Sequence, residues 1–304
     1  MAQMGRQRRS EIFYESLIVF QCAIFGFSFV ALQKLISYGF PTFTIMCLRF
    51  FIGAISLLSI CILSPKSSSL SVKYYKQGTA RGTISGTIMF IAFSLQTFGA
   101  KYTSPANNAL CTGLYVIFVP CIGIVLFKRK NAFIYLAALV SFIGVALISG
   151  FSFRNITLNI GDLLSVLCGF FFAVHFIIME KYTAEGNLPY YTIIQLLTVA
   201  CTSLVVSLLF EQKEYTAIQW QNGLRWIFFL GIVSTSVTYM IQSFVQAKIS
   251  AEKVSVISCS ESLFAVIFSL VLGYSVMSIK LFAGAILILF SMVAVALYSS
   301  RGRC

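Results

Sequence analysis

Long apolar runs separated by short polar connections dominate the pattern of this 304-residue chain. A membrane-spanning helix needs about 20 mostly apolar residues, and ten runs come close to that length. They cover residues 13–35, 41–63, 83–101, 104–127, 132–151, 161–181, 189–210, 224–246, 251–273 and 277–299. Since the strands of a membrane barrel alternate in segments of about 10 residues, the pattern predicts an all-α membrane protein with ten transmembrane helices.

Composition supports the same class of protein. Hydrophobic residues make up 59% of the chain and charged residues only 10%, against about 25% charged residues in soluble domains. These values do not fit a soluble globule, a disordered chain, a coiled coil or a nucleic-acid-binding protein. Eight of the nine cysteines lie inside apolar runs without metal-ligand spacing, so we interpret them as packing residues. The sequence suggests no metal site and no cofactor.

The basic residues predict how the chain is oriented in the membrane. With the N-terminus inside, fifteen Lys and Arg residues fall on inner segments and six on outer ends, while Arg49 lies within a span. Cytoplasmic loops are enriched in Lys and Arg, so we expect both termini in the cytoplasm. Trp220 and Trp226 then fall at the outer interface, where indole rings prefer to lie. The first run lacks a small-residue cleavage site and is expected to remain as a helix.

The two halves of the chain are similar in sequence. The segment FSLQTFGAKYTSPANNALCTGLYVIFVPCIGIVLF, from Phe93, aligns without a gap with YMIQSFVQAKISAEKVSVISCSESLFAVIFSLVLG, from Tyr239. Each half holds five predicted helices, and because five is odd, the second half must enter the membrane inverted. The expected parts are a cytoplasmic tail (1–12), a first five-helix repeat (13–151), an external linker (152–160), a second five-helix repeat (161–299) and a cytoplasmic tail (300–304). Inverted repeats place transporter sites near the bilayer midplane.

Over residues 13–299 these features resemble the EamA-type permeases of the drug/metabolite transporter superfamily. The resemblance rests on the two sets of five helices, on Arg49 in LRFFIGA, and on YTSPANNALCTGLYVIFVP with its counterpart KISAEKVSVISCSESLFAV. It implies a central cavity lined mainly by helices one, three, four, six, eight and nine. The family pattern has a Glu-Pro pair in the ninth helix. Here Ser262 follows Glu261, so no proline is present to kink that helix.

Polar residues at membrane depth are costly and mark candidate sites, although Ser, Thr, Asn and Gln also tie helices together. The fourth and eighth predicted helices each carry polar residues at i, i+4 and i+7 or similar spacing, which places them on one face. Gln96 on the third helix is the repeat partner of Gln242. The predicted substrate-binding residues are Gln96, Asn108, Thr112, Tyr115, Tyr239 and Gln242. Gln21 and Ser28 share a face of the first helix, which packing explains equally well.

Three ionisable residues within the predicted spans each have two interpretations. An ionised lone carboxylate in hydrocarbon costs several kcal/mol, so Glu261 must be protonated, paired or facing water. It is either a coupling group that binds a proton or cation, or a structural hydrogen-bond acceptor. His175, the only histidine, has the same choice between coupling and packing. Arg49 either attracts anions or has a structural role, such as pairing or reaching the lipid headgroups.

The favoured function is a secondary transporter that moves small organic metabolites, such as amino acids or drug-like compounds, by alternating access. The sequence has no Walker-type phosphate loop, so we do not expect ATP-driven pumping by this chain. An intramembrane enzyme, which would need more catalytic groups than one His and one deep Glu, and a structural membrane protein are the alternatives. We expect a multi-pass monomer or homodimer in a bacterial inner membrane, with a small-molecule substrate, no enzymatic activity and no nucleic-acid partner.

Overall fold

The computed structural model describes residues 2–63, 72–103, 105–127, 132–148, 160–183, 187–272 and 279–301. These described ranges contain helices and short connections but no strand. Six of the helices are long and apolar enough to cross a membrane, and shorter apolar helices accompany them. The six long helices are the first three apolar segments of each half of the chain. The chain is therefore an all-helical integral membrane protein.

The helices follow the predicted apolar runs, with two of them extended at their N-terminal ends. The first half consists of α1 (Ala2–Ser37), α2 (Thr42–Leu63), α3 (Val72–Tyr102), α4 (Pro105–Gly113), α5 (Tyr115–Phe127) and α6 (Ala132–Ile148). The second half consists of α7 (Ile160–Thr183), α8 (Leu188–Phe210), the 3-10 helix η1 (Gln212–Ala217), α9 (Trp220–Phe228), the π-helix η2 (Phe229–Val237), α10 (Thr238–Gln246), α11 (Ala251–Ser258), α12 (Ser260–Val271) and α13 (Ile279–Arg301).

Two predicted helices are broken, at equivalent places in the two halves. Between α4 and α5, the Leu114 N–H donates to the Cys111 carbonyl oxygen at 3.3 Å, three residues back. Between α11 and α12, the Cys259 N–H donates to the Val256 carbonyl oxygen at 3.2 Å, again three residues back. Bonds to the third preceding residue tighten the helix and shift its phase. The ninth predicted helix is therefore interrupted although it has no proline.

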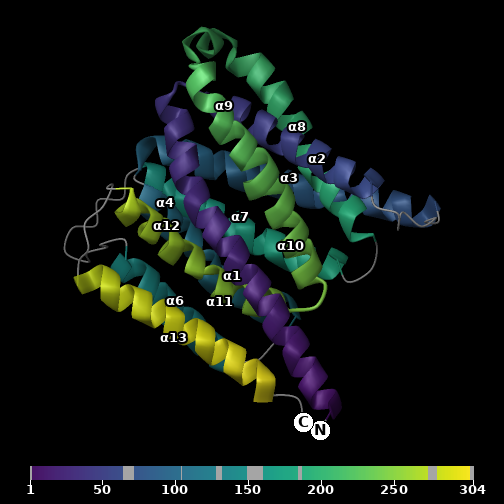
Figure 1. The fold of residues 1–304 in the computed structure, drawn as a ribbon, viewed down its shortest axis with the longest axis vertical. Coiled ribbons are helices and arrows are strands. Elements are labelled where there is room, and N and C mark those ends of the chain that lie inside the picture. Colours follow the sequence, from purple (N-terminus) through teal and green to yellow (C-terminus); the bar gives the residue numbers. More distant parts are fainter. Residues whose placement is uncertain are drawn as a thin grey trace.

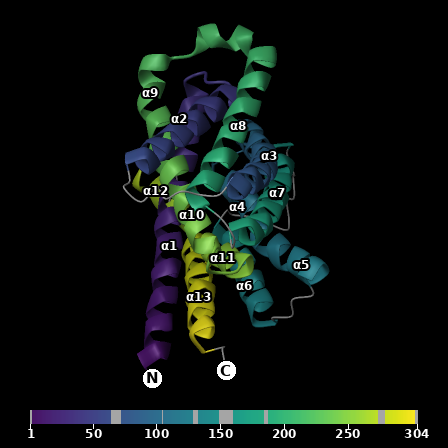
Figure 2. The ribbon, with the colours of Figure 1, turned by 90° about the vertical axis from the view of Figure 1, so that its right-hand side faces the viewer.

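The helices pack in pairs that recur between the two halves (Figures 1 and 2). α2 packs against α8, and α6 packs against α13, so that each helix meets its counterpart. The packing of α3 against α7 corresponds, in the aligned halves, to the packing of η2 and α10 against α1. The contacts of α4 and α5 with α7 correspond to the contact of α12 with α1. Small residues allow close crossings: a Cβ on Gly99 would lie 3.0 Å from the Gly161 carbonyl oxygen.

The two ends of the molecule differ in what they hold. α1 begins and α13 ends at the same end of the molecule, whereas η1 and the start of α9 lie at the opposite end (Figure 2). Trp220 is the first residue of α9. The indoles that the sequence places at the outer interface therefore lie near the end of the molecule opposite to the termini.

Candidate functional site

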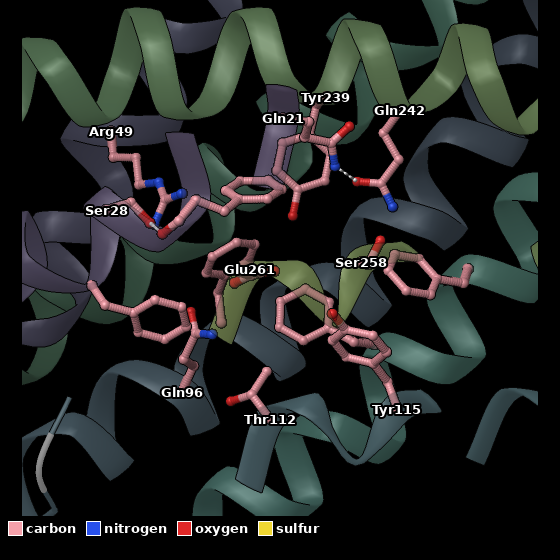
Figure 3. A pocket seen from close by; sticks show the side chains of 15 residues that line it. Gln21, Ser28, Arg49, Gln96, Thr112, Tyr115, Tyr239, Gln242, Ser258 and Glu261 are labelled. Atoms are coloured by element: carbon pink, nitrogen blue, oxygen red, sulfur yellow. Dashed lines mark hydrogen bonds between the residues drawn. The ribbon is translucent and has the colours of Figure 1, made fainter. Parts of the chain in front are cut away.

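A cavity opens between the two halves, and nine helices contribute to its lining (Figure 3). The space between its lining atoms, including the part that is open to solvent, amounts to about 470 Å³. The lining combines seven aromatic rings with amide, hydroxyl, guanidinium and carboxylate groups. These residues are Gln21, Phe25, Ser28 and Phe29 of α1, Arg49 of α2, Phe93 and Gln96 of α3, Thr112 of α4, Tyr115 of α5, Phe172 and Phe176 of α7, Tyr239 and Gln242 of α10, Ser258 of α11 and Glu261 of α12.

Most of the lining residues form pairs that are equivalent in the aligned halves. Six pairs, each with one residue from each half, supply twelve of the fifteen lining residues. The pairs are Phe25 with Phe172, Phe29 with Phe176, Phe93 with Tyr239, Gln96 with Gln242, Thr112 with Ser258, and Tyr115 with Glu261. The remaining three, Gln21, Ser28 and Arg49, all come from the first half.

The structure brings together most of the residues that the sequence singles out. Gln96, Thr112, Tyr115, Tyr239 and Gln242 all line the cavity. Their side chains approach it from both halves of the molecule, as Figure 3 shows.

Asn108 and His175 lie outside the lining. Asn108 is fully buried, and its Nδ2 donates to the Gln96 carbonyl oxygen at 2.9 Å, which ties α4 to α3. His175 is also fully buried, with Nε2 3.2 Å from Oε1 of Gln195 on α8. Its ring centroid is 6.2 Å from that of Tyr239, so His175 packs behind a cavity residue.

Arg49 extends from α2 toward the π-helix η2. Its Nε donates to Thr235 Oγ1 at 2.8 Å, and its Nη2 lies 3.4 Å from the Ser234 carbonyl oxygen and 3.3 Å from the Ser234 hydroxyl. Thr235 Oγ1 itself donates to the Leu230 carbonyl oxygen, five residues back, at 2.7 Å. The guanidinium carbon is 4.7 Å from the centroid of the Phe93 ring, within the range of cation–π attraction. The π-helix thus supplies oxygen acceptors that hold this buried cation.

Glu261 also lines the cavity, as Figure 3 shows. It is the second residue of α12, directly after the break at Cys259. Carboxylates are stabilised near helix N-termini, where backbone N–H groups lack helical partners. Among the described residues, no Lys or Arg nitrogen lies within 4.0 Å of its carboxylate oxygens, and no side chain donates a hydrogen bond to them. The break therefore presents an acidic group to the cavity.

A chain of side-chain amides crosses one side of the cavity, and we call it the amide chain. Gln21 Nε2 donates to Gln242 Oε1 at 3.2 Å, Gln242 Nε2 to Gln246 Oε1 at 3.3 Å, and Gln246 Nε2 to the Phe176 carbonyl oxygen at 2.9 Å. These bonds connect α1, α10 and α7. Gln21 Oε1 and the hydroxyl of Ser258 are buried without a hydrogen-bond partner in the described structure.

Comparison with known proteins agrees with the repeated architecture. The model of the EamA-like transporter family matches the chain twice, over residues 12–150 and 159–297. The chain belongs to the EamA-like transporter family. Its two family matches correspond to the two halves whose equivalent residues line the cavity.

Relatives of this EamA-family protein are also described as transporters. An uncharacterized transporter of Archaeoglobus fulgidus is 25% identical over 275 residues, which cover 88% of this chain and 79% of the relative. The uncharacterized transporter YoaV of Bacillus subtilis is 22% identical, with coverage of 87% and 90%. One solved crystal structure shares the fold with a TM-score of 0.70 at 16% identity, over 95% of this chain and 98% of the other. The protein is a membrane transporter.

Sequence reasoning missed several residues of the lining. Helical periodicity could not distinguish the cavity phenylalanines from the many that pack elsewhere, because 30 Phe are spread over all runs. The alignment of the halves could have found more of them. It pairs Phe29 with Phe176 and Thr112 with Ser258, so a residue chosen in one half points to its counterpart in the other.

Proposed function

We propose that this protein carries a small organic metabolite across the membrane by alternating access around the central cavity. The observation that carries the proposal is that six pairs of equivalent residues from the two halves line one cavity. Two inverted repeats can exchange conformations, so that the same site opens first to one side of the membrane and then to the other. In this proposal the moving units are residues 13–151 and 161–299.

Several features support ten spans arranged as two inverted sets of five. If α4 with α5, α9 with η2 and α10, and α11 with α12 each form one interrupted span, every half has five. Because each half has an odd number of spans, the second half is inverted in the membrane. Because the total number of spans is even, the chain ends on the side of the membrane where it began. That agrees with the shared location of the start of α1 and the end of α13 (Figure 1). The excess of Lys and Arg supports the cytoplasm as that side.

The lining supports a small substrate with both polar and apolar parts. Ligand sites combine apolar walls with a few placed polar groups, and this cavity offers phenylalanine rings beside Gln96, Gln242, Tyr115 and Tyr239. Its volume limits the substrate to a small molecule. We assign substrate contacts to these polar residues and to Thr112, and we assign Asn108 the role of holding α4 against α3. A structural membrane protein would need no such cavity between its halves.

Glu261 is the proposed coupling group. A carboxylate without an ion-pair partner in the described structure, facing a cavity at membrane depth, can exchange a proton or cation when the cavity changes sides. An imposed pH gradient across proteoliposomes should then drive substrate accumulation by the wild type and not by Glu261→Gln. Accumulation that survives this substitution would move the coupling role to His175.

Reconstituted proteoliposomes test the transport proposal. Tyr115 is buried in the lining, whereas Leu126 on α5 is 64% exposed and faces away from the packed interior. Tyr115→Ala should reduce substrate flux at least tenfold, and Leu126→Ala should leave it within twofold at matched protein amounts. Equal flux through both variants would show that the cavity is not part of the transport pathway.

A further inference from the structure

A buried carboxylate joins the two halves of the chain at the end of the molecule opposite to the termini. Glu211 lies between α8 and η1 and is only 5% exposed. Its Oε1 accepts the Phe43 N–H at 2.8 Å, and its Oε2 accepts the Thr44 N–H at 2.8 Å. Both N–H groups belong to the first turn of α2, where backbone donors lack helical partners. Glu211 of the second half therefore caps a helix of the first half.

Two hydroxyl groups complete this contact, and we call Thr44, Ser207 and Glu211 the Glu211 cluster. Thr44 Oγ1 and Ser207 Oγ each donate to Glu211 Oε2 at 2.9 Å, and the two hydroxyl oxygens lie 2.8 Å apart. Thr44 and Ser207 are both buried. Hydrogen bonds to a carboxylate are about twice as strong as those between neutral groups. The cluster therefore holds the start of α2 firmly against the end of α8.

The sequence offers a second contact of the same kind at the end that holds the termini. α2 and its counterpart α8 align without a gap over residues 42–63. The alignment pairs Thr44 with Thr192 and Ser59 with Ser207. In an inverted repeat, the contact equivalent to that of Thr44 with Ser207 is the contact of Thr192 with Ser59.

The described structure lacks this second contact. Thr192 Oγ1 lies 2.7 Å from Ser243 Oγ of α10. Ser59 is exposed, and its hydroxyl donates to a carbonyl oxygen of its own helix at 2.9 Å. The residue aligned with Glu211 is Leu63, whose side chain has no hydrogen-bond acceptor. Within the described ranges, the cluster between α2 and α8 is therefore formed at one end only.

An exchange of conformations between inverted halves converts some contacts and keeps others. A contact between two residues that are not equivalent is replaced by the contact between their counterparts, whereas a contact between a residue and its own counterpart is kept. Ser141 of α6 and Ser291 of α13 are counterparts, because residues 136–148 align with residues 286–298 without a gap. Their buried hydroxyl oxygens lie 2.5 Å apart. The contact of α6 with α13 should therefore persist in both conformations, and the Glu211 cluster should not.

We propose that the Glu211 cluster is a latch of the transport cycle. It is closed in one conformation, and it opens in the other, where Ser59 meets Thr192 at the end that holds the termini. Because Leu63 stands in place of the carboxylate in that second contact, the closed latch is the more stable of the two arrangements. This inference rests on the alternating access proposed above, which it extends to a contact outside the cavity.

Cross-linking of cysteine pairs in right-side-out and inside-out membrane vesicles tests the latch. Each pair is introduced into a chain without the native cysteines and is oxidised. A further cysteine at position 258 of the cavity then reports access by a membrane-impermeant thiol reagent. The pairs are Thr44→Cys with Ser207→Cys for the closed latch, Ser59→Cys with Thr192→Cys for the open latch, and Ser141→Cys with Ser291→Cys for the contact of α6 with α13.

All three pairs should cross-link, with different effects on the cavity. Each of the first two cross-links should restrict the labelling of position 258 to one side of the membrane, and that side should differ between them. The cross-link between α6 and α13 should leave labelling from both sides. The inference is overturned if Ser59→Cys with Thr192→Cys does not cross-link, or if the first two cross-links leave the same access.

Removal of one charge tests the role of Glu211 itself. Glu211→Gln keeps the shape of the side chain but weakens its bonds to the N–H groups of α2, so the cysteines at positions 59 and 192 should cross-link at least about threefold faster. Glu214→Gln removes a charge from the exposed surface of η1 and should leave the rate unchanged. Equal rates in the two variants would show that Glu211 does not hold the latch closed.

Labelling of position 258 without any cross-link separates this inference from the proposed function. If the cavity is labelled from both sides but the cysteines at positions 59 and 192 never cross-link, alternating access holds and the latch is wrong. If the cavity is labelled from one side alone, alternating access is wrong, and the latch is wrong with it.

Discussion

The two halves contribute the same positions to the cavity but different chemistry. Gln96 is matched by Gln242 and Thr112 by Ser258, so amides and hydroxyls occupy equivalent places. Tyr115, in contrast, is matched by Glu261, and Arg49 lines the cavity from the first half alone. The repeated fold thus gives the cavity its shape, while a few unmatched residues give it an acidic and a basic side.

The side-chain bonds that cross the cavity also differ between the halves. The amide chain uses Gln21 and Gln246, whose aligned counterparts are Cys168 and Ala100. Neither of these can donate an amide hydrogen bond. The amide chain therefore has no equivalent at these positions, and we expect the two sides of the cavity to open at different energetic cost.

Exchanging the most different pair should have the largest effect. In the double variant Tyr115→Glu, Glu261→Tyr, the carboxylate moves to the equivalent position in the other half, and Arg49 stays in place. We expect substrate flux in proteoliposomes to fall at least tenfold, or about 1.4 kcal/mol, because the two charges no longer face each other as before. Wild-type flux in a stably folded double variant would mean that the charge asymmetry has no functional role.

Shortening the amide chain should have an intermediate effect. Gln246→Ala gives the second half the residue that the first half has at position 100. It removes the bond to the Phe176 carbonyl oxygen and the bond that Gln246 Oε1 accepts from Gln242. A neutral hydrogen bond contributes about 1 kcal/mol, so we expect the side of the cavity that carries the amide chain to open at least about fivefold more often. The change is measured as the rate at which a membrane-impermeant thiol reagent, applied from that side, labels a single cysteine introduced at position 258.

A surface glutamine provides the control for that experiment. Gln212 is exposed and donates to the Leu208 carbonyl oxygen at 2.6 Å, far in the fold from the amide chain. Gln212→Ala should leave the labelling rate unchanged. Identical rates in Gln246→Ala and Gln212→Ala would show that the amide chain does not hold the cavity closed.

Introducing a proline directly after Glu261 should have the smallest effect. Ser262 is the third residue of α12, and prolines are tolerated in the first turn of a helix. Ser262→Pro removes the backbone bond to the Cys259 carbonyl oxygen and the long 3.5 Å bond from the Ser262 hydroxyl to the Ala109 carbonyl oxygen, so the free energy of unfolding should fall by about 1 kcal/mol. Thermal unfolding in detergent checks this, with Phe268→Pro in the helix interior expected to cost about 3 kcal/mol or more.

Hydropathy predicted where the helices lie but not where they break. The apolar runs are continuous through Leu114 and Cys259, and neither residue is a helix breaker. Pro120, which usually ends or kinks a helix, lies inside α5. The breaks and the π-helix depend on hydrogen bonds between helices and on bonds to the third or fifth preceding residue, which residue types do not reveal.

Helical spacing identified only part of the lining, because it also takes no account of neighbouring helices. It places Asn108 and Thr112 on one face of a straight helix, and Thr112 does line the cavity. The Asn108 amide instead bonds the Gln96 carbonyl oxygen of the neighbouring helix. His175 similarly packs against Gln195, although its counterpart Ser28 lines the cavity. Which polar residue binds a neighbouring helix and which faces a cavity depends on packing partners that are distant in sequence.

Access to the cavity from both sides of the membrane tests the central claim most directly. Thr112→Cys and Ser258→Cys, each in a background without the native cysteines, place one thiol at equivalent positions of the two halves. Alternating access predicts that a membrane-impermeant thiol reagent labels each cysteine in right-side-out and in inside-out vesicles, and that saturating substrate slows the labelling. Labelling from the same single side for both cysteines, with none from the other, would contradict the account.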